Sequence, residues 1–187
     1  NDGSTDGSEK LLSKLKNIDV IHHDSNKGKG KAISSGLKLV KNKFVLLVDG
    51  DIEISLTNLK KQIELDENKI IVGYRWSEDD TYFSINRLGN ILINTIFNII
   101  YQKHYRDILC CVKIIPTELI QSFNLYSTGF EIETEIMANI SSNKLEVTEK
   151  PVSYNRRTVK EGKKIRIEDS LRIIWRMFEF KYHNLVK

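Results

Sequence analysis

Short apolar runs alternate along the first part of the chain with segments whose apolar residues recur at helical spacing. The clearest run, 44–48 (Phe-Val-Leu-Leu-Val), is short, rich in β-forming residues and not alternating, which predicts a buried parallel strand. The other elements expected there are strands at 20–23 and 69–74 and helices at 8–17, 32–41 and 56–66. This alternation is typical of an α/β protein with a parallel sheet and helices on both faces.

Beyond residue 75 the pattern changes, because 88–101 is a long, apolar-rich helical stretch with few charges. Pro116 fits the first turn of a short helix. The remaining expected elements are strands at 109–115 and 145–153, helices at 130–140 and 167–182, and a basic loop at 155–166. We expect one domain over 1–187, with a nucleotide-binding half (1–75), an acceptor half (76–154) and a basic C-terminal part (155–187).

Composition changes this picture little. The chain has 187 residues, enough for one domain with a real core, and its 40% apolar and 29% charged residues are ordinary for a globular protein. Cys110 and Cys111 are adjacent, so we expect reduced thiols that serve as small core residues in a cytoplasmic protein. We see no signal peptide and no uncharged apolar run long enough to span a bilayer.

Positive charge is concentrated at the C-terminal end. Of the chain's 29 Lys/Arg and 25 Asp/Glu, residues 155–187 hold ten and four, which leaves 19 and 21 for the rest. Such a tail fits an anionic partner, of which lipid phosphate or a membrane surface is favoured over nucleic acid, or it is simply a solvated basic tail. Nucleic acid is disfavoured because the tail lacks interleaved aromatic residues.

The candidate chemistry begins with Asp49-Gly50-Asp51, which directly follows the 44–48 strand. Open α/β sheets bind ligands at the carboxyl ends of their strands. Two carboxylates there can hold a divalent metal, which can in turn hold a diphosphate. The same triplet is also an ordinary turn.

Two glycine-rich segments lie upstream of the triplet. Residues 1–8 (NDGSTDGS) place Asp2 where it could bind a nucleobase or ribose, although a capped turn explains them equally simply. Residues 26–32 (NKGKGKA) combine two glycines with Lys29 and Lys31 before a helix, which suits a phosphate at the helix N-terminus. A flexible basic loop is the alternative, because neither the Walker A nor the GxGxxG spacing is present.

The three segments in this order resemble family 2 glycosyltransferases, whose catalytic domain is a GT-A fold with a Rossmann-like, mostly parallel sheet. The resemblance extends to most of the chain. Its further motifs are 73–75 (GYR), Arg87 with 107–113 (DILCCVK), 129–135 (GFEIETE) and 151–165 (PVSYNRRTVKEGKKI). The last of these resembles dolichol-phosphate and polyprenyl-phosphate sugar transferases.

This resemblance implies inverting transfer of a hexose from a UDP- or GDP-sugar with the help of Mg²⁺ or Mn²⁺. It implies that Asp51 holds the metal, with Asp49 nearby on metal-bound water or on ribose. Asp2 and Asp6 would recognise the base and ribose, and Lys29 the base or the diphosphate.

The acceptor decides whether the reaction needs a general base. A sugar hydroxyl does, and Asp107 is the candidate base or acceptor-orienting group, unless it forms an ion pair with Arg106 or Arg87. A polyprenyl (dolichyl) phosphate needs cations instead. The cations that the motif offers are Arg156, Arg157, Lys163 and Lys164.

Three readings of the whole chain follow. The leading one is a lipid-phosphate glycosyltransferase, peripheral at the cytoplasmic face of a membrane. The others are the same fold acting on a saccharide hydroxyl, and a non-catalytic nucleotide-sugar or lipid-binding module. The stretches 88–101 and 171–180 could lie in a membrane interface or pack on the protein's own sheet.

Three smaller expectations complete the analysis. Glu131 and Glu133 either take part in the function or simply favour the first turn of a helix. His22 and His23 are expected in the core or in a loop. The family's first strand, which precedes the opening loop, is absent from 1–187, so we expect an open slot in the sheet and low stability of this chain alone.

Overall fold

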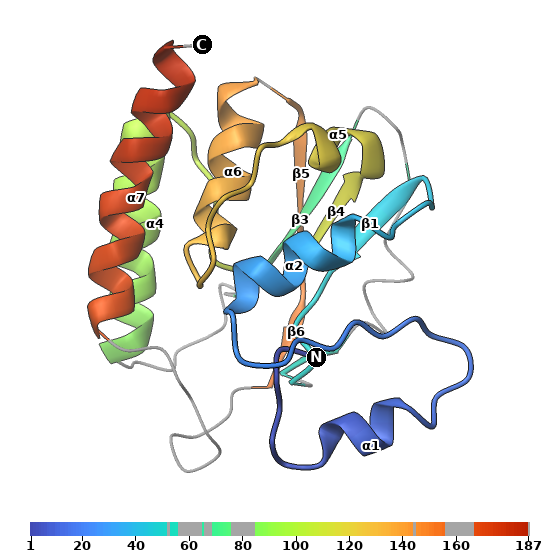
Figure 1. Ribbon diagram of the computed structural model, residues 1–187. Helices are drawn as coiled ribbons and strands as arrows, with labels where there is room; N and C mark the ends of the chain where they lie inside the picture. The colour runs from blue at the N-terminus through green and yellow to red at the C-terminus, as the bar shows by residue number, and fades with distance from the viewer. Residues whose placement is uncertain are drawn as a thin grey trace.

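The computed structural model describes residues 1–51, 53–55, 65, 69–75, 85–143, 145–155 and 167–186. Figure 1 shows a sheet with α2, α5 and α6 against it and the pair α4 and α7 outside α6. The helices are α1 (Ser8–Leu12), α2 (Lys29–Leu37), α4 (Ile85–Tyr101), α5 (Thr117–Ser122), α6 (Ile132–Ser142) and α7 (Ile167–Val186). The strands are β1 (Phe44–Leu47), β2 (Ile54–Ser55), β3 (Ile70–Tyr74), β4 (Lys113–Pro116), β5 (Val147–Pro151) and β6 (Ser153–Tyr154).

The main sheet has the order β1-β4-β3-β5. Strand β4 is antiparallel to both of its neighbours, with Val45 opposite Ile115 and Ile71 opposite Ile114. Strands β3 and β5 are parallel, so β1, β3 and β5 run in one direction. The expected α/β architecture is confirmed, and the strand at 44–48 and the strand at 69–74 both form. The immediate partner of β1, however, is an antiparallel strand.

The first 29 residues contain no buried side chain, and two expectations about them are wrong. Residues 20–23 form no strand, because their only ladder-like contacts are two backbone hydrogen bonds with Asn1. The expected helix to about residue 17 ends at Leu12, since Leu11 and Leu15 are exposed and find nothing to pack against.

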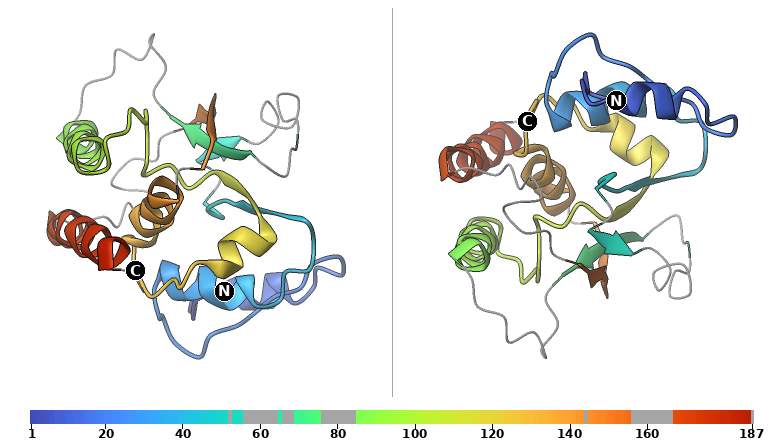
Figure 2. Two further views of the ribbon diagram at one scale, coloured as in Figure 1. Left: turned by 90° about the horizontal axis from the view of Figure 1, so that it is seen from above. Right: turned by 90° about the horizontal axis from the view of Figure 1, so that it is seen from below.

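Helices α4 and α7 lie side by side and form an outer layer on α6, as both views of Figure 2 show. They run in the same direction in Figure 1, and the Tyr101 hydroxyl at the end of α4 donates to the Met177 carbonyl on α7. Each buries one face, with Phe97 and Met177 fully enclosed. Helix α7 packs mainly on α6 and on α4. Among the described residues, no helix combines the length and apolar content that crossing a bilayer requires.

A second, two-stranded sheet pairs β2 with β6 in antiparallel fashion. It brings the chain that follows the acidic triplet beside the chain that precedes the basic loop, and the Asn155 amide donates to the Glu53 carbonyl at 2.7 Å. The expected helix at 56–66 falls almost entirely outside the described residues, and the basic loop expected at 155–166 does so after Asn155.

Helix boundaries differ from expectation by a few residues where tertiary contacts intervene. Helix α2 begins at Lys29 instead of 32, because Gly28 breaks the chain direction with a positive φ of 93°. Helix α7 continues to Val186, four residues past the expected end. The strand expected at 145–153 is divided into β5 and β6, and the strand expected at 109–115 is reduced to β4.

Candidate active site

The acidic triplet lies where β1 ends, and its first carboxylate is bound to the lysine–glycine loop. Lys29 Nζ lies 2.7 Å from Oδ1 and 2.9 Å from Oδ2 of Asp49. Asp51 turns back on its own chain, with Oδ1 accepting the Glu53 amide at 3.2 Å. The triplet and the loop, which the sequence placed in one site, therefore touch.

The opening turn joins the same loop through Asp2. Its two carboxylate oxygens accept the amides of Lys27 at 2.9 Å and Gly28 at 2.7 Å. Its Oδ1 also lies 2.6 Å from His23 Nδ1, while His23 Nε2 lies 2.9 Å from the Ser35 hydroxyl on α2. Burial raises the pKa of Asp2, but these hydrogen bonds outweigh burial and hold the pKa below its ordinary value.

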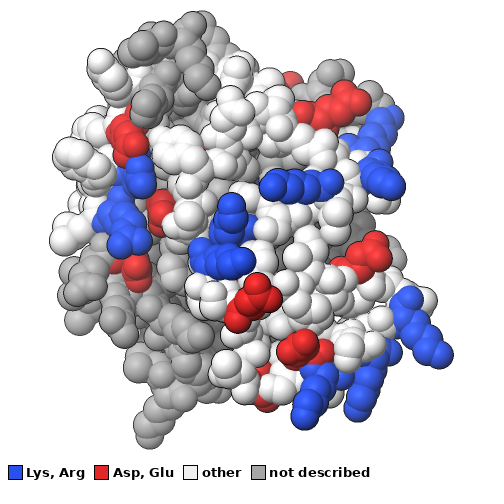
Figure 3. Space-filling model, in the orientation of Figure 1, with Lys and Arg blue, Asp and Glu red and all other residues white. Residues whose placement is uncertain are grey.

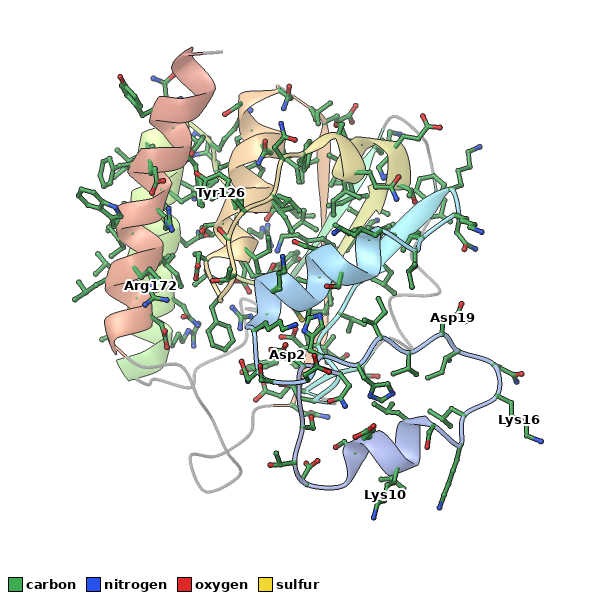
Figure 4. The ribbon with its side chains drawn as sticks, viewed as in Figure 1. Asp2, Lys10, Lys16, Asp19, Tyr126 and Arg172 are labelled. Carbon is green, nitrogen blue, oxygen red and sulfur yellow. The ribbon has the colours of Figure 1, made fainter. Side chains whose placement is uncertain are left out.

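Asp6 lies further out. Its carboxylate accepts the amide of Ser8 at 3.0 Å and the Ser8 hydroxyl at 2.6 Å, at the start of α1. Figure 4 shows Asp2 at the start of α2, whereas Lys10, Lys16 and Asp19 lie on the outlying α1 region. The structure thus brings Asp2 to the loop and leaves Asp6 in a turn that precedes a short exposed helix.

The amides expected to bind a phosphate are used by the protein itself, which corrects the sequence interpretation. Gly30 N and Lys31 N, in the first turn of α2, both donate to the Thr128 carbonyl, at 2.8 and 3.3 Å. The approach is close enough that a Cβ on Gly30 would lie 2.2 Å from the Ser127 carbonyl oxygen. The glycines therefore let the loop pack on 127–128, and only the Lys29 side chain reaches the acidic triplet.

Behind Lys29 lies a chain of buried charges. Glu133 of α6, which is 3% exposed, has Oε1 2.7 Å from Lys29 Nζ and Oε2 in contact with Lys113 Nζ. Burial raises the pKa of Glu133, but the two lysines outweigh burial and hold it below the ordinary value. Burial likewise lowers the pKa of Lys29, yet Glu133 and Asp49 raise it above its ordinary value. Both groups therefore remain charged inside the protein.

The triplet suits a divalent cation that is shared with a substrate. Mg²⁺ and Mn²⁺ favour oxygen ligands, and Mg²⁺ is commonly held by one or two carboxylates together with substrate phosphates. The Asp49 side chain is 39% exposed, so a ligand can reach it from solvent. No cluster of three or more His, Cys, Asp or Glu placed to hold a metal occurs among the described residues. Asp49 and Asp51 are therefore the residues that could hold the ion.

A second buried ion pair joins Arg75, which follows β3, to Asp107. Asp107, which is 2% exposed, accepts Arg75 Nε at 2.7 Å and Arg75 Nη2 at 2.9 Å. The expected alternative pairing of Asp107 with Arg106 or Arg87 is thus replaced by a bidentate pair with Arg75. The Arg75 guanidinium also lies over the Tyr154 ring, 5.5 Å from its centroid.

The two cysteines connect these two charged groups. Cys110 and Cys111 are free and buried, and with Val112 and Val152 they form a small apolar cluster, which confirms their expected role in the core. Leu47, two residues before Asp49, lies opposite Lys113, which is two residues after Cys111. On the other side, the Cys110 amide donates to the Asp107 carbonyl at 3.3 Å. The cluster therefore lies close in the fold to both the acidic triplet and the Arg75–Asp107 pair.

The four cations expected to bind the acceptor phosphate lie outside the described residues: Arg156, Arg157, Lys163 and Lys164. Asn155, the last described residue before them, donates its amide to the carbonyl of Glu53, two residues after the triplet.

Sequence reasoning missed several residues of this site. His23 was expected only in the core or in a loop, because the adjacent His22 and His23 have no partner at a spacing that indicates a site. Lys113 gives one, since a lysine next to two isoleucines in a strand implies a buried anion. The sequence leaves open whether Glu133 has a function or simply favours the first turn of a helix. In the structure its two carboxylate oxygens are paired with Lys29 and Lys113. Arg75 was part of a motif, but its partner could not be deduced.

Comparison with known proteins agrees with this geometry. Residues 1–126 match the profile described as Glycosyl transferase family 2. The chain is 30% identical over 157 residues to "Glycosyltransferase AglJ" of Haloferax volcanii. The matched region covers 81% of this chain and 51% of that protein. It is 22% identical over 163 residues to the "Low-salt glycan biosynthesis hexosyltransferase Agl6" of the same organism, covering 83% and 39%. The chain thus spans about half of the first relative and less of the second.

Solved structures share the fold. Mannosyl-3-phosphoglycerate synthase from Rubrobacter xylanophilus superposes with a TM-score of 0.67 at 18% identity, covering 98% of this chain and 61% of that one. Glucosyl-3-phosphoglycerate synthase from Mycobacterium tuberculosis, in complex with Mn²⁺, UDP-glucose and phosphoglyceric acid, gives a TM-score of 0.67 at 13% identity, covering 96% and 66%. These likenesses establish the GT-A fold that the sequence motifs predicted.

Proposed function

This chain belongs to glycosyl transferase family 2, and on that premise we propose that it transfers a hexose from a nucleotide diphosphate sugar to a polyprenyl (dolichyl) phosphate. The observation that carries the proposal is the meeting of three segments. Lys29 contacts Asp49 at 2.7 Å, and the loop that holds Lys29 is bound to Asp2. One site thus combines the carboxylates of the acidic triplet, the Lys29 ammonium and the Asp2 carboxylate, which would face the nucleoside of the donor.

On the donor side, Asp49 and Asp51 would hold a Mg²⁺ or Mn²⁺ ion, whose chemistry is to neutralise the charge of the departing diphosphate. Lys29 would bind the diphosphate. Asp2 would contact the base or ribose, with Asp6 further along the same turn. A solved protein of the same fold was crystallised with Mn²⁺ and UDP-glucose, which supports a donor site that pairs a divalent cation with a nucleotide sugar.

On the acceptor side, the structure favours a phosphate over a hydroxyl. A hydroxyl acceptor must lose a proton, but both oxygens of Asp107 are held by Arg75 and the side chain is buried. Because Arg75 occupies both oxygens of this buried carboxylate, we assign Asp107 to positioning Arg75. A phosphate acceptor is already an anion and needs cations, for which Arg156, Arg157, Lys163 and Lys164 follow Asn155 directly in the sequence.

The transfer itself is a single displacement with inversion. A phosphate oxygen of the acceptor forms a bond to the anomeric carbon as the bond from that carbon to the diphosphate oxygen breaks. The nucleoside diphosphate leaves with the electron pair, and no proton moves.

A membrane-bound acceptor requires access to a lipid surface, for which α4 and α7 offer an apolar face. Four large side chains project from each helix to solvent, and Trp175 is 72% exposed. They are Leu88, Ile91, Leu92 and Ile99 on α4, and Leu171, Trp175, Phe178 and Tyr182 on α7. Acidic and basic side chains both lie over α7 in Figure 3, so binding there would depend on apolar contact and not on a patch of one charge. We therefore propose that the protein is peripheral at a membrane surface, at its cytoplasmic face.

Transfer of labelled hexose from UDP- and GDP-sugars to a polyprenyl phosphate, with Mn²⁺ or Mg²⁺ in detergent, tests the proposal. Asp51→Ala should lower the rate by about 100-fold or more while the far-UV circular dichroism spectrum is retained. Asp19→Ala, which removes an exposed acid far from the site, should leave the rate unchanged. Transfer to a saccharide hydroxyl but not to lipid phosphate would establish the second reading instead. Nucleotide-sugar binding without transfer would indicate a binding module.

A further inference from the structure

Lys29 is held between two carboxylates, of which only one belongs to the proposed metal site. Its ammonium lies 2.7 Å from Asp49 Oδ1 and 2.7 Å from Glu133 Oε1. Asp49 is partly open to solvent, whereas Glu133 is enclosed by α6 and β4. Lys29 therefore has one partner at the ligand surface and one in the interior.

Glu133 is itself fixed from behind. Its second oxygen is paired with Lys113, which is 0% exposed, and Lys113 Nζ also donates to the carbonyl oxygens of Cys110 and Ile108, the latter at 3.4 Å. A lysine with three acceptors in a closed interior has little freedom to move. Glu133 is thus a rigid anchor, and the flexible member of the group is the Lys29 side chain.

The Asp49 carboxylate cannot contact the Lys29 ammonium through both of its oxygens and bind a divalent cation through the same oxygens at the same time. The ammonium contacts both carboxylate oxygens of Asp49, at 2.7 and 2.9 Å, which are the atoms a cation would need. Like charges this close repel strongly in a partly buried site. Lys29 must therefore leave Asp49 when a cation is bound there, and an incoming diphosphate supplies the negative charge to which it can turn.

From this geometry we propose that Glu133, supported by Lys113, is a positioning residue for the donor site. It keeps the Lys29 ammonium beside the acidic triplet while Lys29 exchanges Asp49 for the donor diphosphate. Cation and nucleoside diphosphate then favour each other's binding, because a cation alone leaves Lys29 with Glu133 only, and a diphosphate alone leaves Asp49 without the Lys29 ammonium. This inference rests on the proposed function, since it requires a diphosphate at the triplet.

Two substitutions should affect the binding of Mn²⁺ alone and of the Mn²⁺ nucleotide differently, which a purely structural role would not produce. Lys29→Met frees Asp49, so it should tighten binding of Mn²⁺ alone several-fold while weakening binding of UDP or GDP with Mn²⁺ about tenfold. Glu133→Gln leaves Lys29 with Asp49 alone, so it should weaken binding of the Mn²⁺ nucleotide about tenfold without tightening binding of Mn²⁺. Isothermal titration calorimetry on this chain measures both constants.

The neighbouring Glu131→Gln is the matched control. Glu131 is equally buried at the start of α6, but its carboxylate accepts the Gly129 amide and has no part in the lysine chain. Its nucleotide affinity should stay within about twofold of the parent. Because Glu133→Gln deprives buried Lys113 of its anion, the double variant Glu133→Gln/Lys113→Met restores the charge balance and provides the same measurement if the single variant does not fold.

The outcomes separate this inference from the proposed function. If the parent chain binds neither UDP nor GDP in the presence of Mn²⁺, the proposed function fails and the inference fails with it. If the parent binds and both Glu133 variants bind equally well, the function stands and Glu133 has no positioning role. Unchanged binding of Mn²⁺ by Lys29→Met would overturn the exchange of partners at Asp49.

Discussion

At the scale of single residues, the buried charged groups among the described residues are either paired with an opposite charge or bound to backbone amides, as Glu131 and Glu135 are. The Arg75–Asp107 pair is the clearest case, because both groups are enclosed and their hydrogen bonds are bidentate. Such a pair costs desolvation energy, and removing one partner leaves the other charge buried without compensation. We therefore infer that this pair, next to the site, serves to hold Arg75 in position more than to stabilise the fold.

We expect Asp107→Asn to destabilise the fold by about 3–5 kcal/mol, since Arg75 would lose its carboxylate. Urea denaturation followed by fluorescence measures the change. Glu179→Gln is the comparison, because it breaks the Arg176–Glu179 pair on α7, which is about one third exposed, and should cost less than about 1 kcal/mol. Equal losses in the two variants would contradict our assignment of Asp107.

The Asp2 carboxylate should make the fold acid-sensitive. Its folded pKa lies below the ordinary value of 3.8, so the stabilisation is complete above that pH and is lost as the pH falls through the folded pKa. Thermal melts between pH 5 and about pH 3 should show the parent losing more stability than Asp2→Asn, which has no proton to take up. Parallel losses in both proteins would mean that Asp2 contributes nothing to this dependence.

At the scale of elements, the contact between the start of α2 and residues 127–128 holds the lysine loop in place. Gly30→Ala would put a Cβ 2.2 Å from a carbonyl oxygen, so we expect a loss of about 1–3 kcal/mol in the free energy of unfolding.

Gly36, in the same helix, has open space around its Cβ position and serves as the control. Gly36→Ala should leave the protein unchanged or stabilise it by up to about 1 kcal/mol, because alanine favours helix. A Gly30→Ala protein as stable as Gly36→Ala would show that the close approach is not required.

The outer face of α4 and α7 should bind lipid. Trp175→Glu is expected to weaken sedimentation with anionic phospholipid vesicles by about tenfold or more, since it replaces a large apolar side chain by a charge. Leu11→Glu changes an equally exposed apolar residue on α1 and should have no effect. If neither variant changes vesicle binding, the face has another role.

At the scale of the whole molecule, burial is uneven. No side chain before Gly30 is buried, whereas α6 is almost entirely enclosed. Local opening costs least where few apolar contacts must break. Hydrogen–deuterium exchange should therefore be fast for amides in 1–27 and slow in α6 and β4, and nucleotide with Mn²⁺ should slow exchange at 26–31. Uniform protection along the chain would contradict this account.

Elements that depend on local sequence patterns could be predicted, whereas contacts between distant segments could not. The elements around the site were found because strand runs and helix spacing are local patterns, as β1 and β3 show. The strand expected at 20–23 failed because strand formation needs a partner, and only Asn1 pairs with it. The amides at 30 and 31 were assigned to phosphate because a helix N-terminus in sequence gives no sign of what will occupy it.

The sequence alone determined the family, the α/β class and the order of the three donor-site segments, because these depend on residue types and spacings that are adjacent in the chain. The tertiary structure alone decided that Lys29 lies between Asp49 and Glu133, that Asp107 is bound to Arg75, and that Thr128 caps α2. Those pairings join residues far apart in sequence. Opposite charges and unpaired amides can combine in many ways, and only packing of the sheet against α6 selects one.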